Sequence, residues 1–358
     1  MTKSTPLSLL IAGILFATMG SPVLAQGYTL GTRESGLSIG NTPRTNGVRI
    51  NFRDRGLEFV NGVNVTIWKP HKPVSGTVSG ASVGILMSGA NRIQGLSFGT
   101  LGIEAEESIT GIGIGGLGVG AGRKMTGVFF GGLGAGAGED LAGIVFGGLG
   151  AGAGRNARGL MFGGLGAGAG EDLEGLVVGG LGAGAGRDLV GVVFAGLGAG
   201  AGRDLVGIVF AGLGAGAGQD FKGVAIGGLG VGAGRDATGL FVGGIGAGAG
   251  STLAGLAISG VGAGAPTVRG VLIAPAVGGQ FVTGILLAPG YARLEPDGVM
   301  RGFSISAFNH MRGDVHGLTI GILNYARSLH GVQIGLLNFA GNNRRGLRWL
   351  PVANVHFD

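Results

Sequence analysis

Histidines are the side chains in this sequence most able to bind a metal or carry a proton near neutral pH. The chain has five of them, His71 and four that follow residue 300: His310, His316, His330 and His356. His316 and His330 each stand directly before a glycine that starts a repeat, so we expect them to stack one coil apart. Acidic residues do not recur at a matching spacing, which favours ordinary turn histidines over a metal site.

Other patterns resemble reactive sites but lack the context that such sites need. Ser304, His310 and Asp314 are close in sequence, yet no nucleophile-elbow pattern surrounds the serine. Gly-x-Gly-x-x-Gly recurs without a long helix after it to bind a phosphate. Gly-x-Gly-x-Asp resembles half of a calcium-binding nonapeptide, but the period here is sixteen. We therefore predict no catalytic residue, no cofactor-binding residue and no metal ligand, and a protein that is not an enzyme.

The elements that hold these residues come from a repeat of sixteen residues that fills positions 111–265. Its ten copies keep one register and begin at Gly111, Gly127, Gly143, Gly159, Gly175, Gly191, Gly207, Gly223, Gly239 and Gly255. A fixed period of this length is typical of architectures in which each unit buries its apolar residues against its neighbours. The repeat therefore predicts a stack of like coils.

Residue types within one copy predict two short strands and two turns. We number the first glycine as position 0; position 1 is then Ile, Val or Leu, position 3 is Phe or another large apolar residue, and position 6 is nearly always Leu. Positions 8 and 10 are Ala or Val between glycines at 7, 9 and 11, an alternation typical of a strand. We expect the residues at 1, 3, 6, 8 and 10 to face inward, with corners at the Gly-Gly pair and at positions 11–13.

Two further features follow from that interpretation. The glycines at positions 7 and 9 predict a strip of bare backbone outside the alanine strand. Position 12 alternates in sign over the first copies, as in Arg123, Glu139 and Arg155, so neighbouring coils attract one another at a solvated edge. A helix is disfavoured, because each glycine in it costs roughly 1 kcal/mol relative to alanine.

The fold class predicted is all-β: a single-chain repeat β-solenoid, or β-roll, with coils of about 16 residues and irregular end caps. Two alternatives stay open. One is a closed antiparallel β-barrel of the outer membrane, whose strands have a comparable length. The other is a shallow ring of β-hairpins around an apolar hole that binds a lipid. The Gly-Gly corner permits a hairpin, while the distinct end segments favour the open stack.

The N-terminal third divides into three segments. Residues 1–25 are typical of a secretory signal peptide, with Lys3, an apolar run and the sequence Ser21-Pro-Val-Leu-Ala25 before the cleavage point. Residues 26–46 are polar and rich in Gly and Thr, so we expect a flexible leader. Residues 47–110 hold degenerate repeats that form an N-terminal cap, with starts at Gly47, Gly62, Gly80 and Gly95.

The C-terminal segment, residues 266–358, carries looser repeats that start at Gly270, Gly284, Gly302, Gly317, Gly331 and Gly346. Asn309, Asn324 and Asn338 share one repeat position, and Asn354 falls one position later. Stacked side-chain amides bond to one another along a column, so we predict an asparagine ladder. A closing strand is expected near Leu350–Asn354.

The doublet GLTIGILNYA…GVQIGLLNFA and the closing strand, over residues 300–358, resemble the bacterial surface repeat-containing family first named in Leptospira. The resemblance implies an exported or envelope-associated repeat protein and no reaction. Many relatives look like lipoproteins, whereas this chain has no cysteine to carry a lipid.

Composition narrows the expected function further. Only 12% of residues are charged and the net charge is +6, without a basic run dense enough for nucleic acid. We expect an exported, non-enzymatic structural or adhesive repeat protein of the bacterial cell envelope; the alternative is an outer-membrane barrel or a lipid-binding ring. Expected partners are a second copy, an envelope component or a membrane, with no nucleic acid and no small-molecule substrate. The expected location is the periplasm, the outer-membrane surface or the medium.

Overall fold

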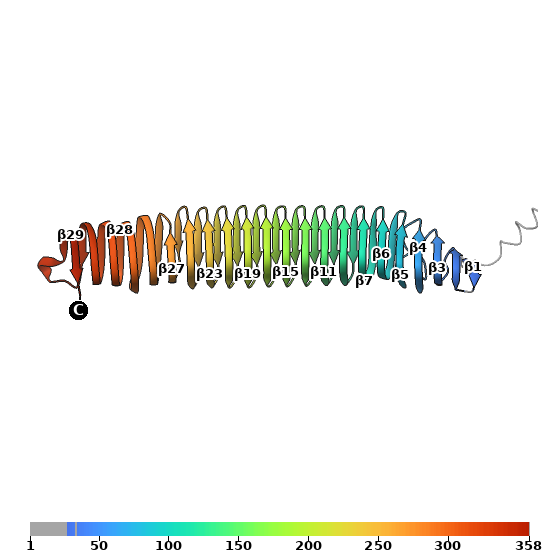
Figure 1. Ribbon diagram of the computed structural model, residues 1–358, viewed down its shortest axis with the longest axis horizontal. Helices are drawn as coiled ribbons and strands as arrows, with labels where there is room; N and C mark the ends of the chain where they lie inside the picture. The colour runs from blue at the N-terminus through green and yellow to red at the C-terminus, as the bar shows by residue number, and fades with distance from the viewer. Residues whose placement is uncertain (1–26, 33, 358) are drawn as a thin grey trace, which may run out of the picture.

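A computed structural model describes residues 27–32 and 34–357, which form a straight rod of stacked β coils (Figure 1). The signal peptide predicted over residues 1–25 lies outside the described residues. Each central coil contains two strands and two turns, as predicted, but one of the strands is long and only the other is short. Successive coils pair in parallel, so the chain is a parallel β-solenoid. The two alternatives, a closed antiparallel barrel and a ring of β-hairpins, both require antiparallel neighbours, so the parallel pairing of these coils contradicts them.

The long strands form one parallel sheet. They are β7 (Gly102–Gly115), β9 (Lys124–Gly131), β11 (Asp140–Gly147), β13 (Ala157–Gly163), β15 (Leu173–Gly179), β17 (Leu189–Ala195), β19 (Leu205–Ala211), β21 (Phe221–Gly227), β23 (Asp236–Gly243), β25 (Thr252–Ser259) and β27 (Thr267–Ile273). Each long strand pairs with the equivalent strand of the next coil at a register shift of one whole repeat, for example Gly143 with Gly159. Identical positions therefore stand in columns along the rod.

The short strands form a second parallel sheet in the same register. They are β8 (Gly118–Ala121), β10 (Gly134–Ala137), β12 (Gly150–Ala153), β14 (Gly166–Ala169), β16 (Gly182–Ala185), β18 (Gly198–Ala201), β20 (Gly214–Ala217), β22 (Gly230–Ala233), β24 (Gly246–Ala249) and β26 (Gly262–Gly264). Backbone bonds continue through the turns; Leu181 N donates to Leu165 O at 2.7 Å and Arg187 N to Glu171 O at 2.9 Å.

A column of glycines fixes the path of the chain at position 0. These residues, from Gly36 to Gly331, have φ between +119° and +152°, a region that residues with a Cβ rarely adopt. From Gly47 onward, an added Cβ would lie 1.8–2.3 Å from the carbonyl oxygen of the equivalent glycine one coil earlier. All predicted starts in the two end segments belong to this column except Gly346. Gly346 lies instead in the 3-10 helix η1 (Arg345–Leu347).

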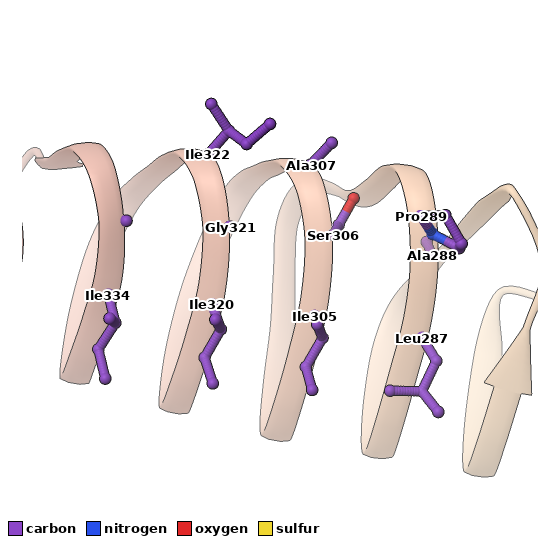
Figure 2. A pocket seen from close by; sticks show the side chains of 11 residues that line it. Leu287, Ala288, Pro289, Ile305, Ser306, Ala307, Ile320, Gly321, Ile322 and Ile334 are labelled. Carbon is purple, nitrogen blue, oxygen red and sulfur yellow. The ribbon is translucent and has the colours of Figure 1, made fainter.

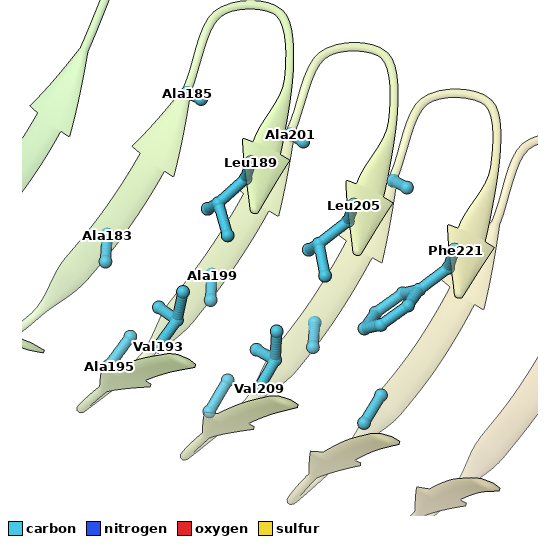
Figure 3. Close-up of a cluster of buried hydrophobic side chains, with 14 of the residues drawn as sticks. Ala183, Ala185, Leu189, Val193, Ala195, Ala199, Ala201, Leu205, Val209 and Phe221 are labelled. Atoms are coloured by element: carbon cyan, nitrogen blue, oxygen red, sulfur yellow. The ribbon is translucent and has the colours of Figure 1, made fainter. Parts of the chain in front are cut away.

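The interior is filled by repeat positions 14, 2, 4, 8 and 10. Position 14 (Leu189, Leu205), position 2 (Val193, Val209) and the alanines at 8 and 10 are all buried and point between the two sheets (Figure 3). The inward placement predicted for positions 8 and 10 is confirmed. The prediction for positions 1, 3 and 6 is wrong: Phe194 and Leu197 are 43% and 46% exposed. No change of parity occurs, because position 4 and position 8 both face inward and position 6 lies in the turn.

Polar groups replace part of the apolar interior in the N-terminal coils. This end contains β1 (Tyr28–Thr32), β2 (Ser35–Ile39), β3 (Arg44–Asn51), β4 (Phe59–Thr66), β5 (Thr77–Gly84) and β6 (Met87–Gly99). Arg49 is fully buried and pairs with Asp54, and Arg49 Nη1 also donates to Asn64 Oδ1 at 2.8 Å. Asp54 accepts further bonds from Asn51, at 2.9 Å, and from Thr66. The Asp54 carboxylate is thus hydrogen-bonded within the cluster, whereas Asn51 Oδ1 is buried without a partner.

The C-terminal coils contain the predicted asparagine ladder. The label β28 (Ala276–Ala340) covers several successive coils. Asn309 Nδ2 donates to Asn324 Oδ1 and Asn324 Nδ2 to Asn338 Oδ1, both at 2.7 Å, and all three residues are fully buried. Asn354 instead donates to backbone oxygens, including Arg348 O at 3.1 Å. It therefore terminates the column without joining the amide chain.

An antiparallel strand lies at each end of the rod. At the C-terminal end β29 (Trp349–His356) runs back along the last coil and contains Pro351, which has no N–H to offer a further strand. At the other end β1 pairs antiparallel with β2, and β2 pairs parallel with β3. The described part of residues 26–46 is thus sheet, where we expected a flexible leader. Its alternating apolar residues, such as Leu37 and Ile39, extend the columns of the repeat.

Candidate functional site

The outer side of the long-strand sheet carries an apolar surface along the whole regular segment, beside a mixed column at position 15 that includes the exposed Arg158, Glu174 and Lys222. The apolar surface consists of the residues at positions 1 and 3, which point away from the interior, and of the leucine column at position 6 in the adjoining turn; we call it the apolar face. The leucine column has nearly constant exposure, from 46% to 57%, and comprises Leu117, Leu133, Leu149, Leu165, Leu181, Leu197, Leu213, Leu229, Ile245 and Val261. Positions 1, 3 and 6 hold no charged residue between 111 and 265.

Stacking between coils orders the side chains of this face. The rings of Phe130 and Phe146 lie parallel with centroids 4.8 Å apart, and those of Phe146 and Phe162 follow at 4.6 Å. Phe194 and Phe210 repeat the arrangement at 5.2 Å. These separations match the spacing of paired strands, so the rings form a ridge along the rod. The face is therefore a regular surface with ridges, and its side chains have fixed neighbours.

The apolar face continues into both end segments. Leu96 and Phe98 extend it at the N-terminal end, at 58% and 46% exposure. In the C-terminal coils the position-3 column is Leu287, Ile305, Ile320 and Ile334, and Figure 2 shows these side chains in a row below Ala307 and Ile322. An open groove of about 470 Å³ lies between the two rows. Its lining is apolar except for Ser306, so it suits a hydrocarbon group.

The turn at positions 11–13 forms a charged edge. From the third regular coil onward, arginines at position 12 pair with the aspartate at position 13 of the preceding coil: Arg187 Nε lies 2.8 Å from Asp172 Oδ1, and Arg203 Nε lies 2.7 Å from Asp188 Oδ1. The predicted pairing along position 12 also occurs, with Arg123 Nε 3.0 Å from Glu139 Oε1. The segment 111–265 holds eight basic and nine acidic residues, so its net charge is −1.

We expect the rod to lose stability on acidification through these pairs. Hydrogen bonds from Arg187 and Arg203 lower the pKa of Asp172 and Asp188 below the ordinary aspartate value. A carboxyl group whose pKa is lower in the folded chain stabilises the fold above its unfolded pKa of about 4, and that contribution disappears as the pH falls through the folded pKa. The melting temperature should therefore fall between pH 5 and pH 2, as followed by circular dichroism.

The variant Asp172→Asn, Asp188→Asn, Asp220→Asn is the control for this titration. It removes three of the carboxyl groups whose pKa an arginine lowers, so its melting temperature should depend less on pH than that of the native chain. An equally steep acid transition in this variant would assign the effect to other groups.

The histidines that the sequence singled out do come together at the C-terminal end. His316 and His330 stack with ring centroids 4.6 Å apart, as predicted, and the ring of His356 lies 6.0 Å from that of His330. The described residues contain no group of three or more His, Cys, Asp or Glu side chains arranged to hold a metal ion. His330 and His356 have other interactions, including His356 Nδ1 with Asn343 Oδ1 at 2.6 Å.

Ser304, His310 and Asp314 are not assembled into a triad. Ser304 Oγ donates to Asn309 Oδ1 at 2.5 Å, at the head of the asparagine ladder. His310 Nδ1 lies 2.8 Å from the hydroxyl of Tyr291, and burial lowers the pKa of its imidazole. In the Gly-x-Gly-x-Asp turns, the carboxylates of Asp172, Asp188 and Asp220 pair with arginines. Ser304, His310 and these aspartates thus each have a partner within the fold.

The apolar face is the feature that the sequence interpretation missed. Both parities of the long strand are apolar, since Val at position 2 alternates with Ile and Phe at positions 1 and 3. An apolar column on each side of one strand is the signal that could have revealed it. A monomeric protein rarely exposes a continuous apolar patch of more than about 600 Å², and larger ones mark interaction sites.

The fold and this surface define a class of protein, a glycine-rich parallel β-solenoid with one apolar side. Comparisons with protein-family models, with curated proteins and with solved structures gave no match to this chain. No helix among the described residues has the length and hydropathy required to cross a bilayer.

Proposed function

We propose that this protein is an exported, non-enzymatic structural or adhesive rod of the bacterial cell envelope. The observation that carries the proposal is the apolar face, which extends along the regular coils while most charged groups are gathered at the opposite turn. A soluble rod without a partner would lower its free energy by placing polar residues there. The straight stack of like coils favours contact along a length over contact at a point.

The sequence supports the export step of this proposal. Residues 1–25 have the layout of a cleavable secretory signal, and a chain without cysteine needs no disulfide to fold in an oxidising compartment. In a Gram-negative host, we expect cleavage after Ala25, so that the purified protein begins at Gln26. Intact-mass analysis and N-terminal sequencing of periplasmic, membrane and medium fractions measure this directly.

Two variants sharpen the export test. Replacement of Ala25 and of Val23 by bulky charged residues, Ala25→Arg and Val23→Arg, should leave the precursor uncleaved because the protease accepts only small residues there. If the native chain instead stays at full length in the cytosol, with no processed form in any other fraction, the proposed location is overturned.

A further inference from the structure

We infer that the apolar face binds the same face of a second copy of this chain, so that two rods lie side by side along their lengths. The inference names the partner for the proposed function and rests on it. Three observations select this occupant: the area of the face, the lack of charge in its three columns and the covered C-terminal end of the rod.

The area of the face is sufficient for a stable dimer. Ten coils at about 4.8 Å spacing extend over about 48 Å, and positions 1–6 span roughly 16 Å at about 3.3 Å per residue. The strip therefore covers roughly 750 Å², close to the ~800 Å² that each partner contributes to a standard interface. The continuation over the end segments adds to this value.

The chemistry of the face favours a protein surface of the same kind over a lipid surface. Peripheral membrane surfaces combine apolar groups with Lys and Arg, and Trp and Tyr gather at the lipid interface. Between 111 and 265 the chain has no Trp or Tyr, and the three apolar columns carry no charge. A net charge of −1 over this segment neither attracts anionic lipid nor keeps two rods apart.

The shape of the face suits lateral pairing. Columns of Phe and Leu make ridges with the same axial repeat in both copies, so the ridges of one face fit between those of the other, as in packed sheets. The rod is straight, which keeps the two faces in contact over many coils (Figure 1). A two-fold axis makes the contact closed and limits it to two copies.

The C-terminal end of the rod disfavours association end to end. A parallel stack would otherwise offer the unpaired backbone of its last coil as a template for another chain. Here β29 covers that coil in the antiparallel sense and carries Pro351, which has no N–H to donate. This end therefore favours contact through the side of the rod.

The test is the mass of the processed protein in solution, measured by sedimentation equilibrium and by light scattering. The native protein should have twice the mass of one chain at micromolar concentration. A fourfold variant places alternating charges on the leucine column: Leu149→Glu, Leu165→Lys, Leu181→Glu, Leu197→Lys. Within one copy these charges attract one another, as the paired residues of the charged edge do. We expect the dissociation constant of this variant to rise about 100-fold or more, because these charges would lose water in the interface.

A matched control carries the same charges on the same coils but on the other sheet: Gly150→Glu, Gly166→Lys, Gly182→Glu, Gly198→Lys. A Cβ at these glycines would meet its nearest atom at 3.6–3.9 Å, so the side chains fit. This control should remain dimeric. A native protein that is a single chain, or a leucine-column variant that stays folded and dimeric, overturns the inference.

Single cysteines supply a measurement that does not depend on the fourfold variants folding. The native chain has no cysteine, so each single substitution provides one unique site. Leu181→Cys places it in the leucine column, and Gly182→Cys places it on the short-strand sheet. A short bifunctional maleimide should join two copies through Cys at 181 and not through Cys at 182; equal yields would contradict face-to-face pairing.

Flotation tests whether the face binds lipid instead. The processed protein is mixed with neutral phosphatidylcholine vesicles and, separately, with anionic phosphatidylglycerol vesicles. A processed monomer that floats through its leucine column overturns the dimer while leaving the proposed export intact.

Discussion

Replacing Gly191 with alanine should destabilise the regular coils by about 3–5 kcal/mol, the sum of a strained backbone and a forced steric contact. Gly191 has φ +140°, and an added Cβ would lie 2.0 Å from Gly175 O. That oxygen belongs to the backbone of the neighbouring coil, so a rotamer change cannot relieve the contact. Urea unfolding followed by circular dichroism should show a lower midpoint, and hydrogen exchange should show lost protection in β15 and β17.

Gly198→Ala is the matched control for this prediction. Gly198 lies on the outer side of β18 in the same coil, where an added Cβ would be 3.9 Å from its nearest atom, Gly214 O. The loss of chain entropy on folding becomes smaller with alanine, so the unfolding free energy should change by less than about 1 kcal/mol. Equal effects of the two substitutions would show that the position-0 column does not determine the path of the chain.

Replacing Asp54 with alanine should destabilise the N-terminal coils by about 3–5 kcal/mol, since it leaves a buried guanidinium without its counter-charge. Arg49 has no exposed surface, and Asp54 also accepts hydrogen bonds from Asn51 and Thr66. Because each coil contacts only its neighbours, the loss should remain local. Amide exchange should accelerate in β3 and β4 while protection in the central coils is retained.

Glu58→Ala provides the exposed counterpart of this change. Glu58 pairs with Arg44 at 2.6 Å in the same coils, but both side chains are more than half exposed. Water replaces the lost partner there, so exchange rates in β3 and β4 should be close to those of the native chain. Similar acceleration in both variants would mean that burial of Arg49 and Asp54 is not what stabilises the cap.

The coil itself could be predicted from the sequence because its determinants are local and repeated. The alternation of glycine with alanine at positions 7–10 indicated a strand, and the charged pair after Gly186 indicated a turn. The glycine spacing located the starts of nearly all coils, even in the end segments where the other residues of the repeat differ. The asparagine ladder followed from the equal repeat position of Asn309, Asn324 and Asn338, which parallel stacking brings to 2.7 Å.

The direction of the long strand could not be predicted in the same way. Alternation identifies an inner face only when the other face is polar, and here Val193 and Phe194 are neighbours on opposite sides of one strand. The size of the residues also led to the wrong prediction, because the phenylalanines at position 3 are the bulkiest residues of the repeat and were therefore expected in the interior. Alanines on the short strand leave the two sheets close together, and Leu189 and Val193 already fill the space between them.

The buried polar cluster of the N-terminal coils was missed for a different reason. Arg49 and Asp54 look like ordinary surface residues in the sequence, and their burial depends on the parallel pairing of β3 with β4, which brings Asn64 and Thr66 beside them. The same applies to Gly346, which continues the glycine spacing but falls after the chain has turned back toward β29.

The whole-repeat register between neighbouring long strands makes the length of this molecule adjustable in steps. Removal of one internal unit, such as residues 175–190, would bring Gly159 beside Gly191 and recreate the same pairing, the same turns and the same columns. Duplication of a unit would add one coil in the same register. Either event would change the length of the rod by about 4.8 Å. Recombination within such a gene can therefore change the length of the rod while its fold stays the same.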